Sequence, residues 1–131
     1  MASPSIFSRI IAGEIPCEKI LEDDRFFAFL DIRPIAPGHA LVVPKTQVDK
    51  LYELDEATLG AMLPFAARVA RALEKAVPCK RVGMIVAGFE VPHAHLHLVP
   101  ISEEGQLTFA NARPASKEDL AKVGAKVRAA L

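Results

Sequence analysis

The 131-residue sequence has no tryptophan, a single tyrosine, two cysteines and no excess charge of either sign. Sixteen basic and sixteen acidic side chains give a formal net charge of zero, whereas proteins that bind mainly the nucleic-acid backbone usually carry a basic excess. Cys17 and Cys79 are too few and too far apart in sequence for a disulfide framework or a Cys-x-x-Cys pair. The composition therefore excludes a disulfide scaffold and argues against a nucleic-acid partner.

Long apolar runs are also missing. The uncharged stretches at 82–89 and 91–102 are too short to span a bilayer, and the N-terminus lacks the apolar core and cleavage site of a signal peptide. We therefore expect a cytoplasmic protein with no membrane partner. The apolar fraction of 51% argues against disorder, and the length fits one domain, residues 1–131.

The sequence patterns predict an α+β fold, with a mostly antiparallel five-stranded sheet on which a long helix and a C-terminal helix pack. Strands are expected at 19–22, 25–30, 39–43, 82–87 and 94–99, with a short turn at 88–92. Helices are expected at 5–12, at 55–77 and from Ser116 to the C-terminus. Pro64 predicts a kink or a break near 60–63 of the long helix. The apolar stripe predicted for the helix at 55–77 consists of Leu59, Met62, Leu63, Ala66, Val69, Ala70 and Leu73.

The four histidines are distributed very unevenly. Three of them, His93, His95 and His97, alternate within five residues, and the fourth is His39. Random placement would produce such a triplet in about one sequence in a thousand. In a strand, all three would project from one face, with apolar neighbours on the other face, and so reach one small ligand.

Two chemistries suit three such imidazoles. They could bind a divalent metal, but the outer two would be about 13 Å apart along a straight strand, which makes convergence on one ion strained. Alternatively, they could divide the work of displacement at phosphorus, with one histidine attacking and the others contacting the phosphoryl oxygens and the leaving group. Displacement at phosphorus is the favoured interpretation.

The residues at 93–99, His-Ala-His-Leu-His-Leu-Val, resemble the His-φ-His-φ-His-φ-φ signature of the histidine triad proteins, where φ is apolar. The segments 6–16, 22–32 and 37–45 are similar to the opening helix and first strands of that family. The resemblance implies hydrolysis or transfer at the α-phosphate of purine nucleotide derivatives, through a nucleotidyl-histidine intermediate. Nucleoside 5′-phosphoramidates are the favoured substrates. Dinucleoside polyphosphate hydrolysis and nucleotidyl transfer are alternatives.

The resemblance also implies roles for the histidines. His95 would be the nucleophile, and His97 would bond the phosphate oxygens or the leaving group. His93 would orient His95, largely through its backbone carbonyl, and His39 would support the cluster from the neighbouring strand.

Nucleotide binding is implied for Asp31, whose carboxylate would accept hydrogen bonds from the ribose hydroxyls. The residues that would line the base pocket are Phe7, Ile10, Ile15, Phe29, Ile32 and Leu41. Some relatives bind zinc through a Cys-x-x-Cys near the N-terminus. Because Ser5 and Ser8 stand at those positions, we expect no metal and no cofactor. The resemblance further implies a homodimer in which the two sheets join.

The segment 84–92 departs from the family pattern. It lacks an Asn found in many relatives, so that Ala87 or Val82 would take that place. Glu90 stands near the expected phosphate, where a carboxylate would repel an anion, although it could instead face an amine leaving group or solvent. These departures leave open a non-catalytic, nucleotide-binding regulatory module.

Overall fold

The computed structural model describes residues 3–131, so Met1 and Ala2, part of the N-terminus used to argue against a signal peptide, lie outside it. Five antiparallel strands form one sheet in the order β1-β2-β3-β5-β4. The strands are β1 (Lys19–Glu22), β2 (Phe26–Leu30), β3 (Ala40–Pro44), β4 (Arg81–Ile85) and β5 (Leu96–Ile101). The α-helices are α1 (Ile6–Ile11), α2 (Glu56–Ala76) and α3 (Lys117–Ala129). The predicted α+β architecture is confirmed.

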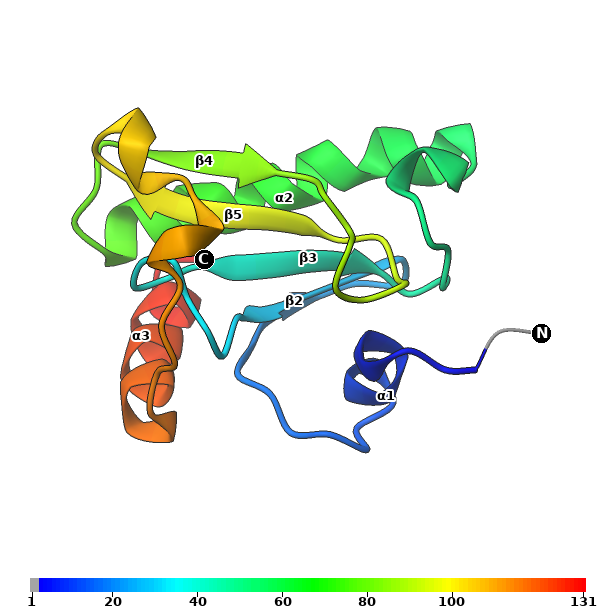
Figure 1. The fold of residues 1–131 in the computed structure, drawn as a ribbon, viewed down its shortest axis with the longest axis horizontal. Coiled ribbons are helices and arrows are strands. Elements are labelled where there is room, and N and C mark those ends of the chain that lie inside the picture. Colours follow the sequence, from blue (N-terminus) through cyan, green and yellow to red (C-terminus); the bar gives the residue numbers. More distant parts are fainter. Residues whose placement is uncertain (1–2) are drawn as a thin grey trace.

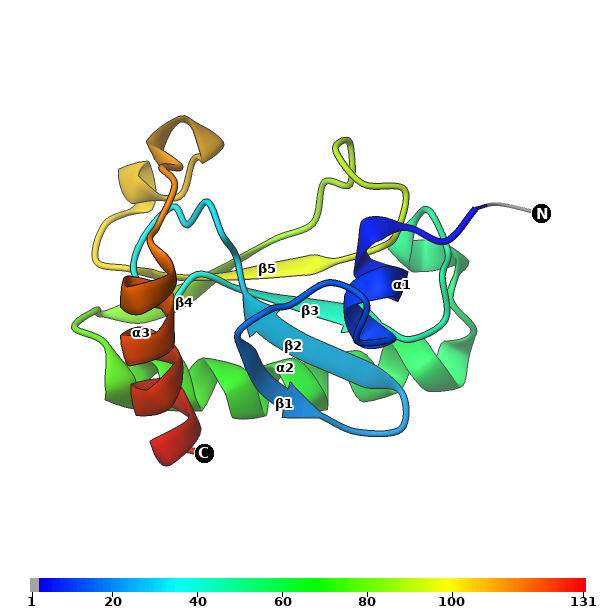
Figure 2. The same ribbon diagram turned by 90° about the horizontal axis from the view of Figure 1, so that it is seen from below.

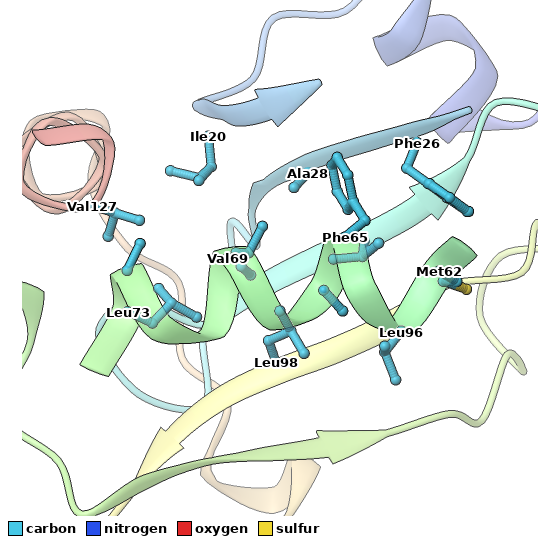
Figure 3. Packing of buried hydrophobic residues seen from close by; sticks show 14 of the residues in the cluster. Ile20, Phe26, Ala28, Met62, Phe65, Val69, Leu73, Leu96, Leu98 and Val127 are labelled. Carbon is cyan, nitrogen blue, oxygen red and sulfur yellow. The ribbon is translucent and has the colours of Figure 1, made fainter. Parts of the chain in front are cut away.

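The sheet is covered on both faces (Figures 1 and 2). The long helix α2 lies along one face, and α1 lies against the other. Figure 3 shows the core between α2 and the sheet, with Val127 of α3 and Ile20 of β1 at one end of it. Every residue of β2, β3 and β5 is buried, because side chains of both alternating sets meet a packed layer.

Both long helices begin at the residues that the sequence indicates. The Asp55 carboxylate accepts a hydrogen bond from the Thr58 backbone N–H at 2.7 Å, and the Ser116 hydroxyl accepts one from the Asp119 N–H at 3.1 Å. Such caps satisfy backbone donors that have no partner within the helix. Within residues 3–131, no helix has both the length and the apolar character needed to cross a bilayer.

The long helix α2 runs through Pro64 without a break. The predicted break is therefore wrong, and only a bend within a continuous helix is compatible with the structure. Proline cannot donate to the carbonyl four residues earlier, which here belongs to Gly60. Gly60 and Pro64 are both exposed, so water can bond that carbonyl.

The predicted apolar stripe of α2 is correct except at Leu63, which is 61% exposed, and at Ala70, which is only partly buried and does not belong to the core cluster. Phe65, which was not included, is 3% exposed and packs in the core (Figure 3). Each helical residue is turned by about 100° from the one before, so Leu63 points well away from the face that buries Met62 and Val69. Size and apolarity alone suggested burial, whereas the angular position decides it.

The β4–β5 connection differs most from the expectation. β4 ends at Ile85 and β5 begins at Leu96, so residues 86–95 form a connection longer than the predicted turn at 88–92. His93 and His95 lie in this connection, and His97 alone among the three lies within the strand. The premise that one straight strand carries all three histidines is therefore wrong.

Candidate active site

The side chains of His95 and His97 lie on the sheet face opposite α2. Leu96 and Leu98, which alternate with them, pack into the core beneath the sheet (Figure 3). His97 pairs with Leu41 of β3, whose side chain belongs to the apolar cluster on the α1 side. The strand alternation thus brings two imidazoles to the same face as α1.

The ring of His95 is held in one tautomer by a backbone group. Its Nδ1 lies 2.6 Å from the carbonyl oxygen of His93, and a carbonyl can only accept, so Nδ1 carries the proton. A neutral imidazole then has an unprotonated Nε2, whose lone pair is available for attack. The ring is packed edge-on against Phe7 at 5.0 Å and His97 at 4.9 Å between ring centroids.

His97 and His39 form a second, connected pair. The Ile35 backbone N–H donates to Nδ1 of His39 at 2.9 Å, so the proton of a neutral His39 is on Nε2. That Nε2 lies 2.9 Å from Nδ1 of His97 and donates to it. The proton of His97 is therefore on its own Nε2, which becomes a hydrogen-bond donor available to a ligand.

Burial keeps this pair neutral. It lowers the pKa of His97 to about 3, with smaller contributions from the neighbouring His39 and His95. The pKa of His39 is also lowered by burial, against the opposing effect of the Asp31 carboxylate, which lies 3.6 Å from its Nε2. At neutral pH His97 and His39 are therefore neutral imidazoles with defined donors and acceptors.

His93 differs from its two partners, because its ring is engaged by the protein itself. Nε2 lies 2.7 Å from the carbonyl oxygen of Pro44, and Nδ1 lies 2.6 Å from the Ser5 hydroxyl. The three triad imidazoles consequently do not converge on one point. Within residues 3–131, the side chains close enough to share a metal ion are instead Asp31, His39 and His97, whose ligand atoms lie within 4.8 Å of one another.

Most residues expected around the base lie together. Phe7 and Ile10 of α1 form one buried cluster with Phe29 and Leu41 of the sheet, and Ile15 packs against it. Ile32 lies apart from this cluster and is 68% exposed. Phe27 and Val43 also belong to the cluster but were not predicted, although they alternate in phase with Phe29 and Leu41.

Asp31 directly follows β2, and its carboxylate is 21% exposed beside the buried His39. One oxygen accepts the Arg33 backbone N–H at 2.9 Å, which fixes the rotamer. Glu90 is exposed within the 86–95 connection.

A cavity of about 270 Å³ opens beside His95. The segments 49–52 and 86–89 line it together with Ala94 and His95. The sequence patterns did not indicate Lys50 and Tyr52 in this lining, because these residues belong to a short 3-10 helix and its N-cap, far from the triad in sequence. Phe109, whose ring packs edge-on 5.0 Å from His97, was also missed, because it lies in a short 3-10 helix after β5 that the sequence patterns do not predict.

Comparison with known families matches residues 12–104 to the HIT domain model, across the sheet and the histidine cluster. This chain belongs to the HIT domain family.

Similar HIT proteins are found in yeasts and bacteria. Adenosine 5′-monophosphoramidase HNT1 of Saccharomyces cerevisiae is 39% identical over 121 residues, covering 91% of this chain and 75% of the yeast protein. Protein hit of Bacillus subtilis is 35% identical over 106 residues, covering 76% and 72% of the two chains. The crystal structure of a Hit-like protein from Bartonella henselae superposes with a TM-score of 0.86 at 33% identity, covering 97% and 96%.

A zinc-bound HIT protein from Mycobacterium smegmatis is also similar in structure, with a TM-score of 0.81 at 32% identity over 95% of this chain and 91% of that one. The Ser5 and Ser8 positions of the present chain do not fit a zinc site. Protein zinc ligands are thiolates, imidazoles and carboxylates, whereas these two hydroxyls are engaged in hydrogen bonds with protein groups.

Proposed function

We propose that this HIT protein hydrolyses purine nucleoside 5′-phosphoramidates at the α-phosphorus, through a nucleotidyl intermediate on His95. The observation that carries the proposal is the hydrogen bond from Nδ1 of His95 to the His93 carbonyl, which leaves Nε2 free to attack. Relatives named adenosine 5′-monophosphoramidase in two yeasts support this substrate class.

The reaction would proceed by two displacements. In the first, Nε2 of His95 bonds to phosphorus, the phosphorus–nitrogen bond of the substrate breaks, and the amine takes up a proton as it leaves. In the second, water attacks phosphorus, the bond to His95 breaks and the nucleoside monophosphate is released with one proton. The free enzyme is restored.

His97 would stabilise both transition states. Its Nε2–H is a donor, as the hydrogen bonds from Ile35 through His39 require, and would bond a phosphoryl oxygen on which negative charge accumulates. The neutrality of the pair supports this role, because a fixed donor costs no reorganisation during the reaction.

The rest of the substrate would lie along the α1 side of the sheet. The cluster of Phe7, Ile10, Phe29 and Leu41, with Ile15 beside it, supports binding of a flat purine, with Ile32 at the exposed margin. Asp31 would accept from the ribose hydroxyls. The cavity beside His95 would take the leaving amine. Residues of the connection 86–95 line this cavity, and Glu90 in the same connection has an exposed side chain.

The test is turnover of AMP–amine conjugates and of diadenosine polyphosphates by the purified protein, beside calorimetric binding of AMP. We expect the conjugates to be hydrolysed faster. The variant His95→Ala should lose about three orders of magnitude or more in turnover and retain AMP binding, because the covalent route is lost and the pocket is not.

Other outcomes would redirect the proposal. Faster cleavage of the polyphosphates would assign the chain to that alternative substrate class. AMP binding without His95-dependent hydrolysis would support the regulatory module suggested by the departures at 84–92. Loss of activity in EDTA, restored by a metal, would favour a metal held by Asp31, His39 and His97.

We further propose that the chain is a one-domain protomer of a homodimer joined along β4. This strand ends the sheet, and apolar side chains around it are exposed, with Met84 at 43% and Val86 at 49%. Sedimentation should give about twice the chain mass of 14.2 kDa, and a monomer mass would refute the dimer.

The expected location is the cytoplasm. Cys17 and Cys79 are both free, and burial raises the pKa of each thiol, which suits cysteines without a redox role. Fractionation of cells that produce the protein would test the location, and recovery outside the cytoplasm would contradict it.

A further inference from the structure

Four polar side chains from distant parts of the sequence meet beside the candidate nucleophile. They are Ser5 and Ser8 at the start of α1, Gln47 after β3, and His93 before β5, and we call them the serine–glutamine network. The Ser5 hydroxyl lies 2.6 Å from Nδ1 of His93, and the Ser8 hydroxyl lies 2.7 Å from Oε1 of Gln47. The Ser5 backbone N–H donates to the same Oε1 at 2.8 Å.

The shortest hydrogen bonds of the network have a defined direction, and the Ser8 hydroxyl lies at a longer 3.4 Å from both the Ser5 hydroxyl and Nδ1 of His93. The Pro44 carbonyl accepts from Nε2 of His93, so Nδ1 of a neutral ring is the acceptor and the Ser5 hydroxyl is its donor. The Ser5 oxygen also accepts the Ser8 backbone N–H at 2.9 Å, as the cap of α1. One hydroxyl thus begins the helix and holds the imidazole.

The network reaches His95 through the backbone. Ser5 is 6% exposed and His93 is 0% exposed, so water cannot replace a lost partner. With both ring nitrogens engaged, His93 is fixed at its ring, and its carbonyl is the group that holds Nδ1 of His95. Gln47 in turn donates to the Ser3 carbonyl at 2.9 Å and ties the chain before α1 to the end of β3.

We propose that Ser5, supported by Ser8 and Gln47, is a positioning residue that fixes His93 and, through the His93 carbonyl, the attacking tautomer of His95. The inference rests on the proposed function for its effect on turnover. It assigns a role to the two positions at which some relatives carry a zinc-binding Cys-x-x-Cys: hydrogen bonds hold His93 there in this chain.

The first measurement needs no substrate. The ¹⁵N chemical shifts of the imidazoles in the nucleotide-free protein report which ring nitrogen carries the proton. We expect Nε2 of His93 to carry it in the wild type, in Ser5→Thr and in Ser5→Ala, because the Pro44 carbonyl fixes that tautomer. The ¹⁵N shift of Nδ1 should change in Ser5→Ala alone, because this nitrogen loses the hydrogen bond from the Ser5 hydroxyl, and an unchanged shift would overturn the proposal. A wild-type His93 protonated on Nδ1 would overturn the proposal, even if Ser5→Ala failed to fold.

The second measurement is turnover, with Ser116→Ala as a matched control. That variant removes the cap of α3 and none of the hydrogen bonds to the four histidines. We expect Ser5→Ala to lower kcat about three- to tenfold with KM changed less than about twofold, Ser5→Thr to recover kcat, and Ser116→Ala to leave both unchanged.

The split between kcat and KM identifies the role. A helix α1 that merely shifts would move Phe7 and Ile10 and raise KM, whereas a poorly oriented His95 lowers kcat. A kcat for Ser5→Ala equal to that of Ser116→Ala would overturn the proposal, as would a rise in KM alone. If the wild type turned over no substrate, the proposed function would fail, while the ¹⁵N shift of Nδ1 of His93 would still show whether Ser5 holds its ring.

Discussion

At the scale of single residues, the chemistry of the site depends on the direction of a few hydrogen bonds. The Ile35 N–H sets the tautomer of His39, which sets that of His97, while the His93 carbonyl sets that of His95. The two adjacent rings therefore present one lone pair and one N–H. Attack at phosphorus requires the lone pair, and stabilisation of a phosphoryl oxygen requires the N–H.

Asp31 provides a test at this scale. If its carboxylate accepts from the ribose hydroxyls, the wild type should prefer an AMP–amine conjugate over its 2′,3′-dideoxy analogue by about 10- to 100-fold in kcat/KM. In Asp31→Ala this ratio should fall towards one, because the acceptor is gone for both substrates. Steady-state kinetics on the two compounds measures it, and an unchanged ratio would remove Asp31 from the ribose site.

The sequence predicted which histidines would gather at the candidate site, but not which of their ring nitrogens carry protons. The His-x-His-x-His spacing predicted the cluster without any structure. The tautomers depend on backbone groups of Ile35, Pro44 and His93, whose positions follow from tertiary packing. Similarly, Ser5 and His93 are 88 positions apart, and no pattern along the chain links them.

At the scale of elements, β2 and β3 form the centre of the molecule, since one face of each packs on α2 and the other on α1. Their short apolar runs predicted these strands to within a residue at each end. The connection 86–95 was predicted too short, because its apolar residues resemble strand and nothing in the sequence marks where pairing with β5 ceases. The last residue pair between β4 and β5 joins Ile85 to His97.

Pro64 allows a prediction at this scale. It costs α2 a backbone hydrogen bond although the helix continues, and its side chain is exposed. Pro64→Ala should therefore raise the free energy of unfolding by about 1–3 kcal/mol, measured by urea denaturation at fixed protein concentration. Glu74→Ala, an exposed change on the same helix, should alter it by less than about 0.5 kcal/mol. A lower stability for Pro64→Ala would contradict this account of the helix.

At the scale of the whole molecule, all four histidines are buried in a chain with no net charge. A small nucleotide can be held by neutral imidazoles, backbone groups and apolar walls, so the site does not require a basic surface. The same burial makes the stability of the protein sensitive to acid.

Lowering the pH below 6.5 should destabilise the fold. The His97 imidazole takes up a proton below about 6.5 when unfolded but only near pH 3 when folded, so the unfolded state binds more protons between these values. Stability therefore rises with pH across this window and falls on acidification. Burial shifts the pKa of His39 and His93 in the same direction.

Denaturation curves from pH 7 to pH 4 test this dependence. His97→Gln should have a shallower slope than the wild type, whatever its absolute stability. Glu22→Gln should differ from the wild type in slope only below the usual carboxyl pKa of about 4.5, since hydrogen bonds from Lys45 and Lys19 lower the pKa of Glu22. An equal slope for His97→Gln and the wild type would contradict the assignment.

A covalent bond between His95 and phosphorus would leave its mark on the configuration at phosphorus. Each in-line displacement inverts phosphorus, so two displacements restore the original configuration and one displacement inverts it. The measurement is hydrolysis, in ¹⁸O-labelled water, of an AMP–amine conjugate carrying a single sulfur of known configuration on its α-phosphorus. We predict retention in the thiophosphate product. Inversion would mean that water attacks the substrate directly and that no nucleotidyl-His95 intermediate forms.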